Sequence, residues 1–506
     1  MNFSGVTMTA RPGRARHGRR DQGGLGPVAV LLREPARPAA VREHRLAPWF
    51  AVATVCFGAF MGQLDASVVT LAFPAIQRQF GAGLAAAQWV SLAYLLALIA
   101  LLVPVGRWSD RHGRKLVYLY GFVVFSAASA ACGLAPTLPV LIGLRVLQAA
   151  GAAMLQANSV ALVATTAPVA ARRAALAVQA AAQALGLAAG PVVGGLLVAS
   201  VGWRWIFFVN VPVGVIAVLA GWFLLPRTRQ LAHGRGIDPL GVALLVTAAA
   251  GTMVAVSSLS GLGLPFLALA GSAAAAAMAG AGLIWWERRS AAPLINLPLL
   301  AAAGIAPALG GALCVYMVLF GPLVLLPQTL AAHGDGVFRA GLLLTALPAG
   351  FGLAAVAAER VLPARWPNRR RCVAGGLLAS CSVAALAIPG PVAATVVSLA
   401  FLGAGLGAYI PANNAQIMAA VPARDAATAG GMVNMTRGLG TALGVAVVTL
   451  GLHAGARLGH ADGGRLAIAA LAVAALAATW AGTRPASGAR SGAMHALGHN
   501  WPGGHR

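Results

Sequence analysis

Fourteen long apolar stretches constrain this chain more than any other feature of the sequence. Each is about 20 residues long, which is the length an α-helix needs to cross a bilayer. The predicted helices lie near residues 49–72, 84–105, 116–134, 138–163, 175–199, 204–225, 237–259, 264–286, 303–328, 339–358, 372–389, 392–418, 428–452 and 464–483. Only 9% of the residues are charged, against about 25% in soluble domains. The sequence therefore predicts an all-α membrane protein.

The loops between these stretches alternate in charge. Loops that follow even-numbered helices are basic, and they contain Arg107, Arg111, Arg114, Lys115, Arg172, Arg173, Arg227, Arg229, Arg235, Arg288, Arg289, Arg360, Arg365, Arg369, Arg370, Arg371 and Arg424. The opposite loops contain little more than Arg78, Arg339, Arg457 and Arg465. Because Lys and Arg accumulate in cytoplasmic loops, we expect an even number of spans and two cytoplasmic termini. The net charge of +25 has the same origin, so no nucleic-acid partner is predicted.

The helices divide into two similar halves. We expect six-helix bundles over residues 49–225 and 303–483, with two inserted helices in 226–302. The second-to-third and tenth-to-eleventh connections are both short and basic, as in a repeat, and repeats around a central site are a common transporter plan. Residues 1–48, which are polar and rich in Arg, and 484–506 are interpreted as disordered cytoplasmic tails.

Two charged residues stand at membrane depth, Asp65 in the first apolar stretch and Arg145 in the fourth. An ionised Asp at a helix centre costs about 2.5–3.5 kcal/mol on insertion scales, so such a residue usually serves a function. Burial favours the neutral acid, which would make Asp65 a reversible proton carrier. Asp65 is the expected partner of Arg145. The alternatives are an Asp that only hydrogen-bonds a neighbour and an Arg held by backbone carbonyls.

Polar side chains on other apolar stretches are candidates to line a cavity. Gln148, Gln156 and Asn158 share the helix of Arg145. The remaining candidates, which the sequence does not rank, are Asn210, Asn413, Asn414, Asn434 and Arg437. Each could equally hydrogen-bond a neighbouring helix.

Two further motifs are candidates for conformational gating. The loop GRWSDRHGRK contains Gly106, Asp110, Arg111, Gly113, Arg114 and Lys115. Asp110 is placed to cap the following helix or to pair with an Arg. The alternative is that the charged loop only determines the membrane topology. The fifth stretch contains Gly186, Gly190, Pro191, Gly194 and Gly195. Glycines four residues apart allow close helix packing, and a proline allows a bend; ordinary tight packing is the alternative.

These motifs resemble the major facilitator superfamily, specifically its fourteen-helix drug:proton antiporter branch. The charged loop is similar to the signature G-x-x-x-D-R-x-G-R-K, with Trp108 in place of the usual Leu. The fourth-helix signature matches at Arg145 and Gln148, but Ala149 stands where Gly is usual. The glycine-rich fifth helix matches at every fixed position. Further similarity in LDASVVTLAFPAI, WRWIFFVNVPVG, IDPLG and GGMVNMTRGLGTALGVAVV extends the resemblance over residues 49–483.

The resemblance implies alternating access by two rocking bundles and export of drug-like molecules against inward proton flow. It implies proton coupling at Asp65 and Arg145, a latch at the Asp110 loop, and bundle packing and bending at the glycines and Pro191. The expected partners are a small-molecule substrate, protons and the lipid bilayer, with no cofactor and a monomeric state.

In the sequence, the charge of the substrate can be inferred only from where the acidic residues lie. Glu359 lies at a helix end and Asp335 in a loop, so the sequence favours neutral, weakly charged or anionic substrates over dications. Exporters of an endogenous metabolite or amino acid, and non-transporting sensors, are the alternative functions. The five cysteines are scattered and form no CxxC pair, and neither a metal site nor an enzyme active site is predicted.

Overall fold

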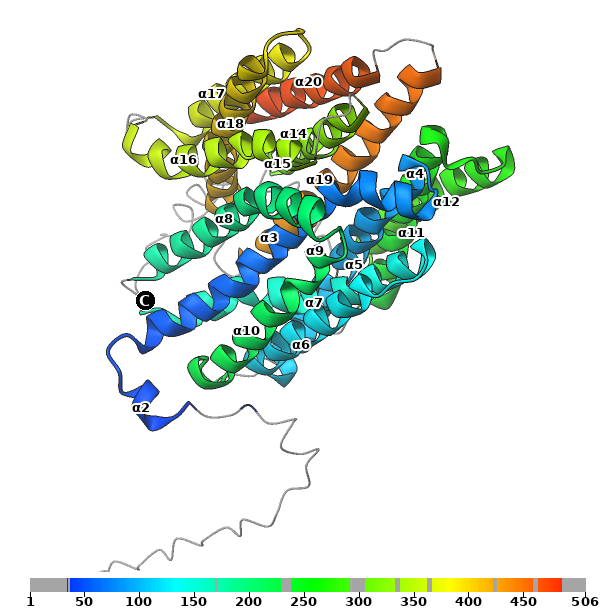
Figure 1. The fold of residues 1–506 in the computed structure, drawn as a ribbon. Helices are drawn as coiled ribbons and strands as arrows, with labels where there is room; N and C mark the ends of the chain where they lie inside the picture. The colour runs from blue at the N-terminus through cyan, green and yellow to red at the C-terminus, as the bar shows by residue number, and fades with distance from the viewer. Residues whose placement is uncertain are drawn as a thin grey trace, which may run out of the picture.

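A computed structural model describes residues 34, 37–168, 171–228, 238–290, 293, 305–332, 337–361, 366–421, 426–457 and 463–484. The helices there are α2 (Ala39–Arg42), α3 (Ala47–Phe80), α4 (Leu84–Ala87), α5 (Trp89–His112), α6 (Arg114–Gly133), α7 (Leu138–Thr166), α8 (Arg172–Ser200), α9 (Trp205–Phe208), α10 (Asn210–Leu224), α11 (Pro239–Ser257), η2 (Ser258–Leu262), α12 (Phe266–Glu287), α14 (Ala306–Ala332), α15 (Val337–Leu344), α16 (Ala346–Val361), α17 (Asn368–Leu386), α18 (Val392–Ala420), α19 (Ala426–Arg457) and α20 (Gly463–Gly482). No strand occurs in these ranges (Figure 1).

Thirteen helical segments within the described ranges are long and apolar enough to cross a membrane. Together with α17 they match the fourteen predicted spans. Helix α17 falls short on composition because it begins with the basic run Arg369–Arg371 and then holds several small residues. The prediction of an all-α membrane fold is confirmed, with this one weakly apolar helix packed against α18 and α20.

The two halves repeat one pattern of helix pairing, as the sequence predicted. In the first half, α3 packs on α8, α7 on both α5 and α6, and α10 on α6. In the second half, α14 packs on α19, α18 on both α16 and α17, and α20 on α17. These are the same pairs in the same order, and Figure 1 shows the second set above the first.

The halves meet mainly where α8 packs on α15 and α16, α5 on α19, and α3 on α14. The inserted helices α11 and α12 pack on each other, and α11 also contacts both α5 and α19. A small apolar cluster of Ile99, Leu245, Leu283 and Met435 holds this junction together. The inserted pair therefore lies beside the seam between the bundles.

The hairpin of α11 and α12 is fastened by a single carboxylate. Asp238 caps α11 by accepting a hydrogen bond from Gly241 N (2.9 Å), and it also accepts from Trp286 Nε1 (2.9 Å) and Ser290 Oγ (3.0 Å) near the end of α12. Burial acts to raise the pKa of this carboxyl, but these hydrogen bonds outweigh it and the pKa lies below its ordinary value.

The segment before α3 contains one short helix in the part that the structure describes. Residues 39–42, which the sequence placed in a disordered tail, form α2. Arg37 Nε donates to Leu224 O (2.6 Å), and Arg227 Nε donates to Glu34 O (2.7 Å). This stretch therefore docks against the end of α10. We call the end of the molecule where Glu34, Gly113 and Leu225 lie the N-terminal face, and the other end the opposite face.

Candidate transport site

Asp65 and Arg145 form an ion pair inside the first bundle, as the sequence predicted. Arg145 Nη1 lies 2.7 Å from Asp65 Oδ2, and the two side chains are 1% and 0% exposed. Arg145 also donates through Nε to Val90 O (2.9 Å). Both proposed alternatives for these residues therefore fail, because Asp65 faces a full charge and Arg145 uses a carboxylate as well as a carbonyl.

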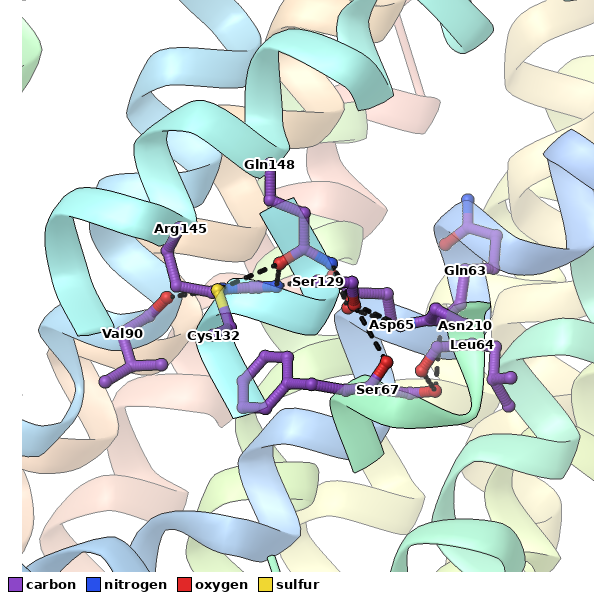
Figure 2. A network of polar contacts seen from close by, with 11 residues as sticks. Gln63, Leu64, Asp65, Ser67, Val90, Ser129, Cys132, Arg145, Gln148 and Asn210 are labelled. Atoms are coloured by element: carbon purple, nitrogen blue, oxygen red, sulfur yellow. Dashed lines mark hydrogen bonds and ion pairs between the residues drawn. The ribbon is translucent and has the colours of Figure 1, made fainter. Parts of the chain in front are cut away.

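Amides and a hydroxyl complete the network around Asp65 (Figure 2). Gln148 accepts from Arg145 Nη1 (2.6 Å) and donates to Asp65 Oδ1 (3.0 Å) and Ser129 Oγ (3.1 Å). Asn210 Nδ2 donates to Ser129 Oγ (3.0 Å) and Asp65 Oδ1 (3.4 Å). Helices α3, α6, α7 and α10 thus converge on one carboxylate, and each of its oxygens has a partner.

This network supplies the hydrogen bonds that a buried ion pair needs. Two buried ions are tolerated only when good geometry and extra hydrogen bonds offset their desolvation. Here Arg145 has Asp65, Gln148 and Val90 as acceptors, and Tyr94 stacks its ring 4.0 Å from the guanidinium carbon. Asp65 is therefore held by an arginine that has two further acceptors in place.

A cavity lies between the bundles, next to this network. It encloses about 30 Å³ and is lined from the first bundle by Gln63, Tyr94 and Gln156 and from the second by Asn434 and Arg437, among others. Drug-sized ligands need roughly 300–1,000 Å³. The cavity is therefore contracted here, and the bundles must separate before a ligand of that size can enter.

Arg437 joins the two bundles across this cavity. Its Nη2 donates to Gln156 Oε1 (2.6 Å), which links α19 with α7. Tyr316 of α14 lies close to the same guanidinium. Close by, Gly438 leaves room for Ile99 of α5, since a Cβ there would come within 2.6 Å of Ile99 Cγ1. Near the middle of the interface, the bundles are thus joined by one polar contact, Arg437 with Gln156, and by one tight apolar contact, Gly438 with Ile99.

The eight candidate lining residues separate into three groups. Gln156, Asn434 and Arg437 line the cavity. Gln148 and Asn210 belong to the Asp65 network instead. The others do not line this cavity: Asn158 donates to Met154 O of its own helix, Asn413 donates to Ala308 O and so ties α18 to α14, and Asn414 is half-buried on α18. A polar residue type alone does not say which neighbour it serves, so the sequence could not separate these groups.

The glycine-rich face of α8 packs against α3. A Cβ at Gly186 would collide with Phe60 O, one at Gly190 with Ser67, and one at Gly194 would approach Val68 Cγ2 to 2.7 Å. This is the close packing that the four-residue spacing predicted. It lies inside the first bundle.

Pro191 and Gly195 occupy a different face of α8 and meet the other bundle. A Cβ at Gly341 of α15 would collide with Pro191 O and come within 3.2 Å of the Gly195 Cα. At the opposite face Gln328 Nε2 donates to Gln77 Oε1 (3.1 Å), which joins α14 to α3. The bundles are therefore in contact at the opposite face, through backbone as well as side chains.

The basic loop is short because Gly113 turns the chain between α5 and α6 with φ of 106°. Lys115 Nζ donates to Trp222 O (2.9 Å) and Leu225 O (2.7 Å), which fixes the start of α6 to the end of α10. Asp110 lies within α5, which continues to His112, so the N-cap position of α6 falls at Gly113. The side chain of Asp110 lies outside the described part, as do those of Glu359 and Asp335.

Glu34 caps α6. Its Oε1 accepts from the backbone N–H groups of Lys115 (3.2 Å) and Leu116 (3.4 Å), and its Oε2 from Thr228 N (2.5 Å). A carboxylate at a helix N-terminus also interacts favourably with the helix dipole. An acidic residue in a basic tail was the only sequence signal for this role.

We expect Glu34→Ala to lower the free energy of unfolding by about 1–2 kcal/mol, the usual range for losing a helix cap. The melting temperature of the purified protein in detergent, followed by intrinsic fluorescence, measures this loss. Glu43→Ala is the matched control, because Glu43 only makes an exposed pair with Arg42. Equal melting temperatures for the two variants would contradict the capping role.

Tyr94 is one of three site residues that the sequence did not reveal, together with Gln63 and Ser129. It lines the cavity on one side and stacks on Arg145 on the other. Its signal in the sequence is weak: a tyrosine in the middle of the apolar run SLAYLLALIA, away from the bilayer interfaces where tyrosines gather.

Two six-helix bundles related by one pairing pattern, a buried ion pair and a cavity at their interface define a multi-pass membrane transporter. The sequence profile of the Major Facilitator Superfamily matches residues 55–445. The chain therefore belongs to the major facilitator superfamily.

Similar proteins come from actinobacteria and other bacteria. The chain is 31% identical to the tetracenomycin C resistance and export protein of Streptomyces glaucescens, over 81% of this chain and 77% of that one. It is 31% identical to the methylenomycin A resistance protein of Streptomyces coelicolor, over 82% and 86%. The solved structure of an autoinhibited POT family peptide transporter superposes with a TM-score of 0.63 at 16% identity, covering 92% of this chain and 99% of that one. This last likeness concerns the fold alone.

Proposed function

We propose that this protein exports drug-like or antibiotic small molecules across the bacterial cytoplasmic membrane in exchange for protons. The single observation that carries the proton coupling is the Asp65–Arg145 pair, wholly buried beside the interfacial cavity. The names of the Streptomyces relatives, which refer to antibiotic resistance and export, support the substrate class. The basic loops at the N-terminal face support a cytoplasmic location for that face.

Proton binding at Asp65 would act through Arg145. A protonated Asp65 no longer balances the arginine charge, and Gln148 Oε1 and Val90 O, at 2.6 and 2.9 Å, are the acceptors that remain. Tyr94 stacks on this guanidinium and lines the cavity. A shift of Arg145 toward its other acceptors would therefore move a wall of the cavity, which couples the proton to the space that a substrate occupies.

Alternating access requires the contacts at the opposite face to part. With the N-terminal face in the cytoplasm, the contacts of Gly341 with Pro191 and of Gln328 with Gln77 close the outer side. This region holds few polar contacts between the bundles, and Gly341 and Pro191 are small. The bundles can therefore separate here without leaving buried charges unpaired. The charged loop lies at the other end, where a latch for the outward-open state would be needed.

Gradient-driven transport tests this function directly. A susceptibility panel in a pump-deleted host first identifies compounds that the protein excludes. Everted membrane vesicles then take up those compounds when their lumen is acidified. We expect nigericin, which exchanges protons for potassium, to stop uptake, and substrate addition to release luminal protons. Uptake that persists after the pH gradient collapses would refute proton antiport.

One comparison favours a second candidate, the transport of a specific metabolite. The chain is 28% identical to the riboflavin transporter RibZ of Clostridioides difficile, over 79% of this chain and 87% of that one. A protein of this kind would protect the host against no antibiotic in the panel, and vesicles would accumulate one vitamin-like compound instead.

A further inference from the structure

The cavity between the bundles has a single charged side chain among its described lining residues, and that charge is positive. Arg437 reaches it from α19, and the rest of the lining is neutral. The nearby carboxylate, Asp65, is engaged by Arg145 at 2.7 Å and by Gln148 at 3.0 Å. The electrostatic potential inside the cavity is therefore set by Arg437.

Arg437 makes few of the hydrogen bonds available to it. A guanidinium carries five N–H donors. Its hydrogen-bond partner among the described residues is the neutral Gln156 Oε1 (2.6 Å), and the neutral side chain of Tyr316 lies close by. No carboxylate pairs with it in that part of the chain, although an arginine at membrane depth normally pairs with an acid or with carbonyl groups. An anion entering the cavity would supply the missing counter-charge.

A second donor lies on the other wall. The Tyr94 hydroxyl is buried and has no hydrogen-bond partner, while its ring is held against Arg145. A buried hydroxyl without a partner costs roughly 1–3 kcal/mol, so such groups in native proteins need an explanation. An oxygen of a bound ligand would satisfy it. Tyr94 and Arg437 come from different bundles, so one ligand oxygen group would be recognised by both halves.

The apolar part of the cavity wall favours ligands whose main ring system is apolar. Leu98, Leu102 and Phe320 line the same cavity and offer apolar surface without donors. Apolar walls with a few placed polar groups are typical of sites for small organic ligands. The site therefore suits a compound with an apolar ring system and one acidic oxygen group at its edge.

We propose that this cavity recognises amphiphilic anions, with the ligand's carboxylate or phenolate paired to Arg437 and hydrogen-bonded by Tyr94. The proposal rests on the proposed function in taking this cavity as the transport site. It narrows the substrate from any drug-like molecule to acidic ones. Cationic compounds of the same shape are excluded because Arg437 repels them.

Two dyes that share a xanthene ring test the charge requirement. Fluorescein is anionic and rhodamine 6G is cationic at neutral pH. We would measure binding of each by fluorescence anisotropy to the full-length protein in nanodiscs of zwitterionic lipid. The wild-type protein should bind fluorescein at least tenfold more tightly than rhodamine 6G. Arg437→Gln should weaken fluorescein binding roughly 10- to 100-fold, the range for losing a charged hydrogen bond, and leave rhodamine 6G unchanged or tighter.

Further variants separate recognition from folding. Arg437→Lys keeps the charge and should retain most of the preference for fluorescein. Tyr94→Phe keeps the ring on Arg145 and removes only the hydroxyl, so fluorescein binding should weaken by about 5- to 10-fold. Arg204→Gln is the matched control, because Arg204 bonds Gln79 and Ala135 away from the cavity. If Arg437→Gln does not fold, the Lys and Phe variants decide the question.

A wild-type preference for rhodamine 6G, or equal losses for both dyes in Arg437→Gln with an unchanged melting temperature, would overturn the proposal. Unaltered fluorescein binding in Tyr94→Phe would remove the role of the hydroxyl. Gradient-driven uptake of a cationic dye alone would leave proton antiport standing and refute anion recognition. Anion-selective binding without gradient-driven uptake would support anion recognition and refute proton antiport.

Discussion

Asp65→Asn should reduce gradient-driven efflux to background. The substitution keeps the shape of the side chain and its ability to accept hydrogen bonds from Gln148 and Asn210, but it removes the group that takes up a proton. It also leaves the buried Arg145 without its counter-charge. Breaking a buried pair from one side costs roughly 3–5 kcal/mol, so the melting temperature should fall as well. Uptake into acid-interior vesicles measures the first effect, and thermal unfolding measures the second.

Two controls separate lost coupling from lost stability. The double variant Asp65→Asn with Arg145→Gln leaves no unpaired ion, so its melting temperature should rise again while transport stays at background. Asp238→Asn makes the same chemical change at the α11–α12 hairpin and should leave coupling intact. Full gradient-driven efflux by Asp65→Asn would remove Asp65 from the proton pathway.

Gly190→Val is expected to disrupt the first bundle. Even a single Cβ at this position would collide with Ser67 of α3, and the next backbone atom in reach is Val68 N at 3.3 Å. Helices α3 and α8 would have to move apart along their whole packed face. Overfilling a close-packed site costs about 1–3 kcal/mol and sometimes more. We expect a large fall in the yield of monodisperse protein and in its melting temperature.

Gly143→Val is the matched control for this prediction. Gly143 lies within α7 of the same bundle, and a Cβ there meets nothing within 4 Å. Both substitutions introduce the same β-branched residue into a helix, so the change in helix propensity is the same for both. A difference in melting temperature therefore reports on packing. A similar melting temperature for the two variants would mean that the close approach of α3 and α8 is not needed.

Much of the architecture could be predicted because the bilayer imposes it. Span length and loop charge located all fourteen helices, including α17, whose basic start weakens its apolar signal, although α3 and α5 run eight and seven residues past their predicted ends at 72 and 105. The pairing of Asp65 with Arg145 was also predictable, since a buried charge needs a counter-charge and few acids lie at that depth. The glycine spacing predicted close packing, which the structure places between α3 and α8.

The remaining features depend on which side chains meet across helices, and sequence spacing does not contain that information. Asn210 and Asn413 are both buried asparagines, yet one completes the Asp65 network and the other ties α18 to α14. Tyr94 matters because it is placed between Arg145 and the cavity. Glu34 can cap α6 because α5 continues to His112 and leaves Gly113, which has no side chain, at the N-cap position. Each of these facts is a distance in space between residues far apart in the chain.

The inserted helices make the two sides of the transporter unequal toward lipid. Helix α11 lies against both α5 and α19, so one seam between the bundles is covered, while α12 presents Phe266 and Leu267, each about four-fifths exposed at 78% and 82%, to the surroundings. Among the described helices none lies over the other seam, between α8 and α15. The two seams are therefore closed differently: one carries an additional helix pair, and the other is closed by the direct packing of α8 on α15 and α16.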